Sequence, residues 1–552
     1  MLKFGTLVNH YQIYMAANSM VRGVLTFPSL TSLLLAQPST IQGATPGSIT
    51  DRTDHYDTLG WYLQDDLRVR SNVTLNLGLR YEFNTQLQEV HGIQAALRNI
   101  QQDATTTVGP LFKNPSLHDF SPRFGFAWDV KGDGKTAVRG GFGLLYDIGN
   151  FGTAIFDTIS GTPPFSNTST LQTPPAIALT LPVTFPASAS GKSPNLINYS
   201  LQQPHMLQYN LTVDRQLPFD MALTLSYAGS RGLNLMQLRE GNPTVPQILP
   251  DGQQFWTGSD PRKNPNWNNI RIITAGGNSW YNSLQVGFMK RLTKGLQLQS
   301  SYTYSKLIDD ADEQVPADRT GLPADSVHRQ LDRGPAAFDL TQNWRLNAIY
   351  RFPQMTSNGI LRKVMNGWWT SGILSLQSGY PYELTVTNDR SRQKSGTIVA
   401  SRPDLVPGRT GSNITHGVSA GCLGIPAGTK IGPPNLYYDP CAFTIPPLGS
   451  LGTLGRDFLR GPGLANLDFS LVKDSPLHFL GEGGKLEFRA EFFNILNRVN
   501  FATPGVGGGG GNTAGTIFAG AQNVEPPVAS AGVPTNTATT SRQIQFALKI
   551  IF

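Results

Sequence analysis

The histidines are the side chains of this sequence best suited to bind a metal or to move a proton, and their spacing argues against both roles. No two stand in a His-x-x-x-His pattern, and no cysteine lies at a metal-ligand spacing. The many carboxylates include no pair whose proximity the sequence establishes, so no acid–base dyad can be argued. We therefore expect no metal, no cofactor and no enzymatic activity. The eight histidines are His10, His55, His91, His118, His205, His328, His416 and His478.

Two further segments match ligand sites only in part. Gly134-Lys135-Thr136 is similar to the end of a phosphate-binding loop, but Asp129 stands where the first glycine of that loop belongs. Asp309-Asp310-Ala311-Asp312-Glu313 offers oxygen ligands for Ca²⁺, yet it lacks the glycine and the distal glutamate of an EF-hand loop. We interpret the first segment as a hairpin turn and the second as a solvated loop tip.

The composition differs from that of an ordinary soluble domain. Charged residues make up 15% of the chain, against ~25% in typical soluble domains, and hydrophobic residues make up 39%. Small polar residues and 58 glycines fill the difference, which suits a surface that meets water on one side and an apolar phase on the other. The net charge is +7, but Lys and Arg form no run, so we expect no nucleic-acid partner.

Alternation of apolar and polar residues is the strongest pattern in the sequence. From Val73 to Phe83 every odd position is apolar and every even position is polar or glycine. Side chains on a strand point to opposite faces in turn, so such a segment has one apolar and one polar face. We expect the apolar set to face lipid and the polar set to face an interior. In one segment these sets are Leu207, Tyr209, Leu211 and Val213 against Gln208, Asn210, Thr212 and Asp214.

Short and long connections alternate strictly between the predicted strands. Tight turns near 131–135 and 291–295 contrast with long Gly/Pro/Asn/Ser-rich stretches such as 149–203 and 388–463. Repeated loops of that length count against a compact soluble domain, and no stretch approaches the ~18–20 consecutive apolar residues of a spanning helix. The predicted strands lie near 2–14, 56–69, 73–84, 122–130, 136–147, 204–215, 219–229, 280–290, 295–307, 338–352, 367–387, 464–473, 484–494 and 541–552.

We therefore predict an all-β protein, a transmembrane antiparallel β-barrel with short turns on one side and long extracellular loops on the other. An even strand count places both chain ends on the side of the short turns. Aromatic residues near strand ends are typical of the membrane interface, although ordinary core packing remains the alternative. They are Trp61, Tyr62, Trp128, Trp280, Tyr281, Trp368, Trp369, Tyr380 and Tyr382.

Several segments, in their order along the chain, resemble TonB-dependent receptors, in particular the Oar-like outer-membrane β-barrels of Gram-negative bacteria. They are Trp61-Tyr62-Leu63-Gln64-Asp65-Asp66-Leu67-Arg68-Val69, Phe120-Ser121-Pro122-Arg123-Phe124-Gly125-Phe126-Ala127-Trp128, Arg139-Gly140-Gly141-Phe142-Gly143 and Glu487-Phe488-Arg489-Ala490-Glu491-Phe492-Phe493-Asn494. The resemblance implies a receptor in the cell outer membrane that binds a nutrient of unknown identity and transports it with energy supplied through TonB.

The last strand ends in an aromatic residue at the carboxy-terminus. This pattern looks like the β-signal that the barrel-assembly machinery reads, carried by Phe546, Leu548, Ile550 and Phe552. The alternative is an edge strand that happens to end in phenylalanine.

The resemblance is incomplete at the amino-terminal side. No signal peptide, TonB-contacting segment or plug is visible, and transporters of this kind have 22 strands. We therefore expect residues 1–552 to be an N-terminally truncated barrel domain, about 14 strands of a larger barrel. Its expected partners are outer-membrane lipid and the barrel-assembly machinery, with TonB reached only through the missing part. A passive porin-like channel and a surface adhesion or display barrel are the alternative functions.

The two cysteines, Cys422 and Cys441, lie in the same predicted extracellular loop. Two cysteines are too few for a disulfide-dense scaffold or a four-cysteine zinc site. An oxidising compartment lets a disulfide persist, so we expect them to pair. Two free thiols are the alternative.

Overall fold

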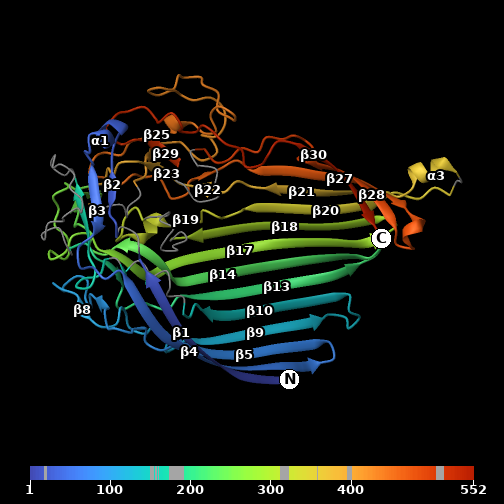
Figure 1. The fold of residues 1–552 in the computed structure, drawn as a ribbon, viewed down its shortest axis with the longest axis horizontal. Coiled ribbons are helices and arrows are strands. Elements are labelled where there is room, and N and C mark those ends of the chain that lie inside the picture. Colours follow the sequence, from blue (N-terminus) through green and yellow to red (C-terminus); the bar gives the residue numbers. More distant parts are fainter. Residues whose placement is uncertain are drawn as a thin grey trace.

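The main sheet dominates the molecule (Figure 1). The computed structural model describes residues 1–17, 21–149, 155, 158–159, 161–172, 192–310, 323–356, 359–394, 401–504 and 515–552. In this part of the chain the main sheet has 17 strands, of which β6, β12 and β19 are short. The long strands are β1 (Leu2–Ala16), β4 (Asp51–Arg70), β5 (Val73–Asn84), β9 (Phe120–Asp129), β10 (Thr136–Tyr146), β13 (His205–Leu217), β14 (Met221–Glu240), β17 (Arg271–Thr293), β18 (Leu296–Asp309), β20 (Gln342–Arg351), β21 (Trp368–Gln377), β27 (Leu464–Pro476), β28 (Lys485–Phe493) and β30 (Gln543–Ile551).

Each long strand pairs antiparallel with the next one along the chain. The fourteen predicted strands are all present, and the predicted alternation of short and long connections is confirmed. Both termini lie at the end of the sheet that carries the short turns (Figure 1). Among the described residues β1 pairs only with β4 and β30 only with β28, so these two strands form the edges of an open sheet.

The short turns have the backbone geometry that tight hairpins need. Lys294 and Gly295 join β17 to β18 with φ angles of 50° and 80°, and two such residues match the twist of the flanking strands. The segment Gly134-Lys135-Thr136 also belongs to a hairpin, as predicted. There the Asp129 carboxylate accepts hydrogen bonds from the backbone N–H groups of Gly132 and Gly134, at 3.0 and 2.8 Å.

Strands β14 and β17 are longer than predicted, because part of the expected loop at 230–279 belongs to them. Their pairing shifts register between Gly232 and Leu235 and again at Met236. A bulge of this kind inserts extra residues into one strand, so that the apolar side chains change from odd to even residue numbers, or the reverse, beyond the bulge. The alternation that reveals a strand is therefore broken at the bulge, and the sequence beyond it looks like loop.

Strand β21 is shorter than the predicted strand at 367–387. It ends at Gln377, and the chain then leaves the wall through Gly379 and Pro381. A Cβ atom on Gly379 would lie 1.7 Å from the carbonyl oxygen of Gly461, so the close approach of the two segments requires glycine. Pro381 lacks the N–H that a central strand would need.

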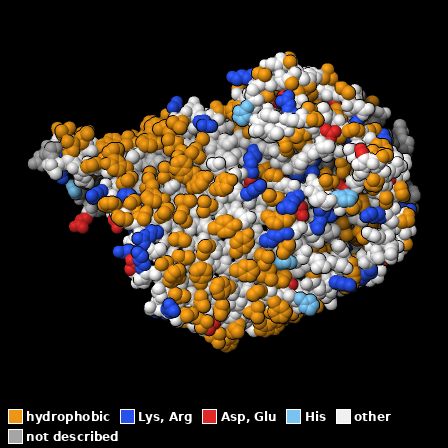
Figure 2. Space-filling view, turned by 180° about the vertical axis from the view of Figure 1, so that it is seen from behind, with side chains coloured by type: hydrophobic (Ala, Val, Ile, Leu, Met, Phe, Trp, Pro, Cys, Tyr) orange, Lys and Arg blue, Asp and Glu red, His pale blue; other side chains and the backbone are white. Residues whose placement is uncertain are grey.

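The two faces of the wall differ in chemistry as predicted. Across β5, β9, β10 and β13, register pairs place Leu77, Phe124, Phe142 and Tyr209 side by side on one face, and the first three are exposed. Figure 2 shows hydrophobic side chains spread over much of the strand surface. On the other face of β13 and β14, Thr212 and Ser226 share a hydrogen bond of 2.7 Å. An apolar outer face and a hydrogen-bonded polar inner face are what a membrane-spanning barrel wall requires.

The aromatic residues at strand ends do not all lie at the outer face. Trp61 and Trp128 are exposed on it, in agreement with the prediction. Tyr281, however, lines an inner cavity, and Tyr382 is buried among the loops. Neighbouring residues on a strand point to opposite faces, so a pair such as Trp280 and Tyr281 cannot both face lipid.

The long connections fold into short elements at one end of the sheet (Figure 1). No helix in the described part of the chain is long and apolar enough to span a membrane. The helices are α1 (Leu30–Leu34), α3 (Ile360–Met365) and the 3-10 turns η2 (Arg329–Asp332), η3 (Pro440–Ala442) and η4 (His478–Leu480). The short strands are β2 (Val24–Thr26), β3 (Thr40–Ala44), β6 (Gln88–Glu89), β7 (Ala95–Ala96), β8 (Thr107–Val108), β11 (Thr168–Gln172), β12 (Asn195–Ile197), β15 (Gln247–Ile248), β16 (Gln254–Phe255), β19 (Gly334–Pro335), β22 (Pro381–Tyr382), β23 (Leu384–Val386), β24 (Asp404–Leu405), β25 (Phe443–Thr444), β26 (Leu459–Arg460) and β29 (Gly515–Phe518).

Candidate functional site

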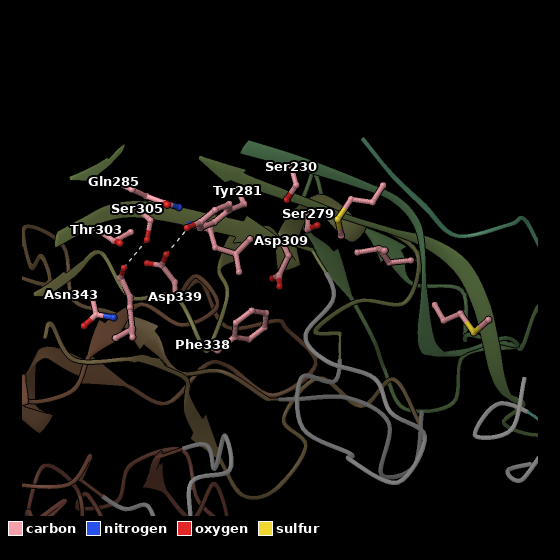
Figure 3. A pocket seen from close by; sticks show the side chains of 15 residues that line it. Ser230, Ser279, Tyr281, Gln285, Thr303, Ser305, Asp309, Phe338, Asp339 and Asn343 are labelled. Carbon is pink, nitrogen blue, oxygen red and sulfur yellow. Dashed lines mark hydrogen bonds between the residues drawn. The ribbon is translucent and has the colours of Figure 1, made fainter. Parts of the chain in front are cut away.

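A cavity of about 710 Å³ lies against the inner face of the wall, in the half of the strands nearer the long loops. One side is formed by β14, β17 and β18, and the other by the segment 338–340 with the start of β20 (Figure 3). We name it the wall cavity. Its volume falls in the ~300–1,000 Å³ range of small-molecule sites.

The alternation of the strands places the side chains of the wall cavity. On β17 and β18 the lining residues have odd numbers, and three register pairs across the two strands are Tyr281 with Leu307, Ser283 with Ser305 and Gln285 with Thr303. All but Ser283 line the cavity. The even-numbered neighbours Leu284 and Tyr304 are exposed on the opposite face. The period-2 pattern that gives the wall its lipid face therefore also gives the cavity its polar lining.

The segment that covers the cavity is held to the wall by hydrogen bonds. The Ser305 hydroxyl donates to the carbonyl oxygen of Leu340 at 2.7 Å, and the backbone N–H of Leu307 donates to Oδ1 of Asp339 at 2.7 Å (Figure 3). Both contacts follow Phe338, whose ring is about half exposed. On the other side of Phe338 the backbone N–H of Ala336 donates to the carbonyl oxygen of Leu307 at 3.1 Å, so the chain is fixed on both sides of an aromatic ring that lines the cavity.

Both carboxylates of the wall cavity are neutralised by arginines from the connection between β21 and β27. Arg456 pairs with Asp309, donating also to its carbonyl oxygen at 3.1 Å. Arg460 pairs with Asp339 and donates to the carbonyl oxygen of Gly379 at 3.2 Å. Burial lowers the pKa of the Arg456 guanidinium to about 10. The nearby carboxylate of Asp457 raises this pKa but only partly offsets the effect of burial. Arg456 therefore stays charged at neutral pH, and the pairs leave the cavity without net charge from these groups.

Five neutral polar side chains of the cavity make no hydrogen bond within the described part of the chain. The Oδ1 atom of Asn343 is buried as well as unpaired. Polar groups in protein interiors are normally paired with protein or water, so this set is available to a bound molecule. The five residues are Ser230, Ser279, Tyr281, Thr303 and Asn343.

The family model for an outer membrane beta barrel domain matches residues 1–545. The chain belongs to this family. The polar inner face is therefore the lumen side of an outer-membrane barrel, and the exposed apolar face is its lipid side, as the sequence predicts. No curated protein matches the sequence.

Solved structures to which this chain is similar include outer-membrane proteins of two bacteria. The transporter YddB from Escherichia coli has a TM-score of 0.43 and 11% identity, over 93% of this chain and 46% of that one. The pyoverdine receptor FpvA from Pseudomonas aeruginosa has a TM-score of 0.39 and 11% identity, over 91% and 43%. The ferric-catecholate import receptor Fiu from E. coli has a TM-score of 0.38 and 10% identity, over 93% and 50%. The chain spans about half the length of these structures.

The cysteines of this outer-membrane barrel lie together in a folded loop. The Sγ atoms of Cys422 and Cys441 are 2.04 Å apart and the Cα atoms 5.4 Å apart. The carboxylate of Asp439, which is fully buried, accepts from the N–H of Cys441 at 3.1 Å and from the hydroxyl of Ser419 at 2.7 Å. The loop packs on an apolar cluster that includes Tyr382, Leu384, Val386, Ile414, Tyr438, Phe443, Leu459 and Ile517.

A second buried arginine ties the loops of the barrel together. Arg402 donates to Oε1 of Glu383 at 2.5 Å and to Oδ1 of Asp332 at 2.8 Å. Burial lowers the pKa of the Arg402 guanidinium. The carboxylates of Glu383 and Asp332 raise it by a larger amount, so the pKa lies above its usual value. This cluster joins residues near β23, η2 and β24 that are far apart in sequence.

The proposed β-signal lies on an edge strand of the barrel. Phe546, Leu548 and Ile550 alternate along β30 and are exposed, and Phe552 follows the strand with 90% of its surface exposed. The apolar side chains of the last strand are therefore accessible to lipid or to another protein. Whether the assembly machinery recognises them stays a prediction.

The acidic segment 309–313 is the remaining candidate ligand site from the sequence. Among the described residues no group of three or more His, Cys, Asp or Glu side chains lies close enough to hold a metal ion. Asp309 pairs with Arg456, and Asp310 accepts from the N–H of Asn278 at 2.5 Å. The rest of that acidic segment, 311–313, lies outside the described residues. Sequence reasoning missed Arg456 and Arg460, because nothing local distinguishes them from other loop arginines.

Proposed function

We propose that this chain is the barrel wall of a TonB-dependent receptor that binds a nutrient and admits it across the outer membrane. The observation that carries the proposal is the wall cavity. It opens on the lumen side of the barrel, in the half nearer the long loops, and it has small-molecule size and unpaired polar groups. A ligand bound there would already have passed the loops and would face the interior of the barrel.

The family membership and the sequence motifs both support this proposal. The family places the wall in the outer membrane, and the motifs at 61–69, 120–128 and 487–494 resemble those of TonB-dependent receptors. A transport function also fits the cavity, because both of its carboxylates are held by arginines. The plug and the TonB-contacting segment belong to the proposal as parts outside residues 1–552.

The test compares two deletion strains of the source bacterium, one lacking this gene and one lacking tonB. Both are grown with single nutrients at limiting concentration, and uptake of each nutrient is measured. We expect at least one nutrient whose uptake falls in both strains and is restored in the first by the intact gene. Uptake that depends on this gene but survives the loss of tonB would point to a passive pore and would contradict the proposal.

A further inference from the structure

The unpaired polar groups of the wall cavity restrict what can fill it. The hydroxyl groups of Ser230, Ser279, Tyr281 and Thr303 and the amide of Asn343 have no hydrogen-bond partner among the described residues. An apolar ligand would remove these groups from water without replacing their hydrogen bonds, which is costly for each group. The occupant must therefore carry several donors and acceptors of its own.

The charges around the cavity restrict the ligand further. An anion would meet the carboxylates of Asp309 and Asp339, both almost fully buried. A cation would have to compete with Arg456 and Arg460, which already pair with those carboxylates. Breaking a buried ion pair leaves an uncompensated charge and is strongly unfavourable. A neutral ligand meets neither penalty.

Apolar side chains also line the cavity, one of them on the covering segment opposite the polar groups. The ring of Phe338 faces the cavity from the covering segment (Figure 3), and Leu235, Met236 and Leu307 line the wall beside it. A ligand that fits both sides has C–H faces and hydroxyl edges. Sugar rings have this combination.

We propose that the wall cavity binds a neutral saccharide of one or two sugar rings. The inference rests on the proposed function and deepens it by naming the substrate class. The hydroxyls of Tyr281 and Thr303 and the amide of Asn343 bind the sugar hydroxyls, while Phe338 contacts a C–H face. The arginines already occupy the carboxylates of the cavity, so these carboxylates do not bind the ligand.

The first experiment compares sugars that differ in charge. The intact protein is extracted from outer membranes into a detergent without a sugar headgroup, and binding is measured calorimetrically with glucose, maltose, glucuronate and glucosamine. We expect saturable binding of glucose or maltose at millimolar or lower concentration, and weaker binding of the anionic and cationic analogues. Absence of binding by both neutral sugars, or equal binding of glucuronate, would overturn the proposal.

The second experiment locates the binding in the wall cavity. Tyr281→Phe and Thr303→Val each remove one hydroxyl that faces the cavity, and we expect each to weaken binding about threefold to tenfold. Tyr304→Phe is the matched control, because it removes a hydroxyl from the same sheet on the lipid side, where Tyr304 is exposed. Wild-type affinity in both cavity variants would show that the sugar binds elsewhere and would overturn the assignment.

The two proposals fail in different ways. Binding to the extracted protein needs no TonB. If the protein binds sugar but uptake survives the deletion of tonB, the assignment of the cavity stands and only energised transport is contradicted. TonB-dependent uptake of a different nutrient, with no sugar binding, would contradict only the substrate class.

Discussion

The guanidinium of Arg456 binds the carboxylate of Asp309, 147 positions away in the sequence, and so fastens the connection between β21 and β27 to the inner wall of the barrel. Both side chains are almost fully buried. Asp309 is the last residue of β18, where the wall meets the long loops. This ion pair, at the rim of the wall cavity, is therefore one of the contacts that fix the position of this connection, together with that of Arg460 and Asp339.

Loss of Arg456 should release that connection. We expect Arg456→Gln to destabilise the docked loop by about 3–5 kcal/mol, because it leaves the Asp309 carboxylate buried and unpaired. Cleavage by proteinase K within 445–463 should become faster in the variant. The double variant Arg456→Met with Asp309→Leu should be cleaved more slowly than the single one, since the Asp309 carboxylate is no longer buried without a partner and only that of Asp457, 3.6 Å from the guanidinium in the wild type, loses its arginine. Lys131→Gln, in an exposed hairpin turn, is the control.

The two faces of β13 should respond differently to a charge. Leu211 is 48% exposed on the lipid face, and an arginine there should cost about 2–4 kcal/mol of folding free energy in a bilayer. Asn210→Arg, one residue away on the lumen face, should cost far less. Folding titrations in lipid vesicles measure both. Equal costs would contradict the assignment of the faces.

Cys422 and Cys441 should resist thiol reagents until they are reduced. We expect no labelling of the folded protein without reductant and two labels per chain after reduction. Replacing both by serine should loosen the loop by about 3 kcal/mol according to the chain-entropy model, seen as faster amide exchange around 422–441. Complete labelling of untreated protein would show that the thiols are free.

Phe552 should matter for assembly rather than for stability. Its side chain is 90% exposed, so Phe552→Ser removes little packing from the folded sheet. We expect the amount of protein inserted in the outer membrane to fall several-fold, while the refolded variant unfolds at the same denaturant concentration as the wild type. Phe479→Ser, at another highly exposed aromatic side chain, is the control and should insert normally.

The strands could be predicted from the sequence because their signal is local. The alternation from Val73 to Phe83 alone determines which side chains face lipid, and β5 has these bounds within one residue. The bulge beyond Gly232 could not be predicted, since it depends on how β14 and β17 pair. The wall cavity could be predicted only in part. Alternation gives the inward direction of Thr303, whereas Tyr281 was expected at the membrane interface and lines the cavity instead. The covering segment and its arginines are placed by contacts between distant parts of the chain.

The extra length of β14 and β17 changes how the barrel meets its surroundings. A barrel strand crosses the hydrocarbon with ~9–11 residues, whereas β14 has 20 and β17 has 23. Roughly half of each strand therefore continues beyond the lipid, and at ~3.3 Å per residue the paired strands form a ribbon about 30–40 Å long, measured along the strands. The upper part of the ribbon packs against the other loops, because Leu238 of β14 and Ile273 of β17 are buried among them. The wall of the barrel therefore continues beyond the lipid as part of the folded layer of loops, where Trp267 and Ile270 of the connection are buried as well.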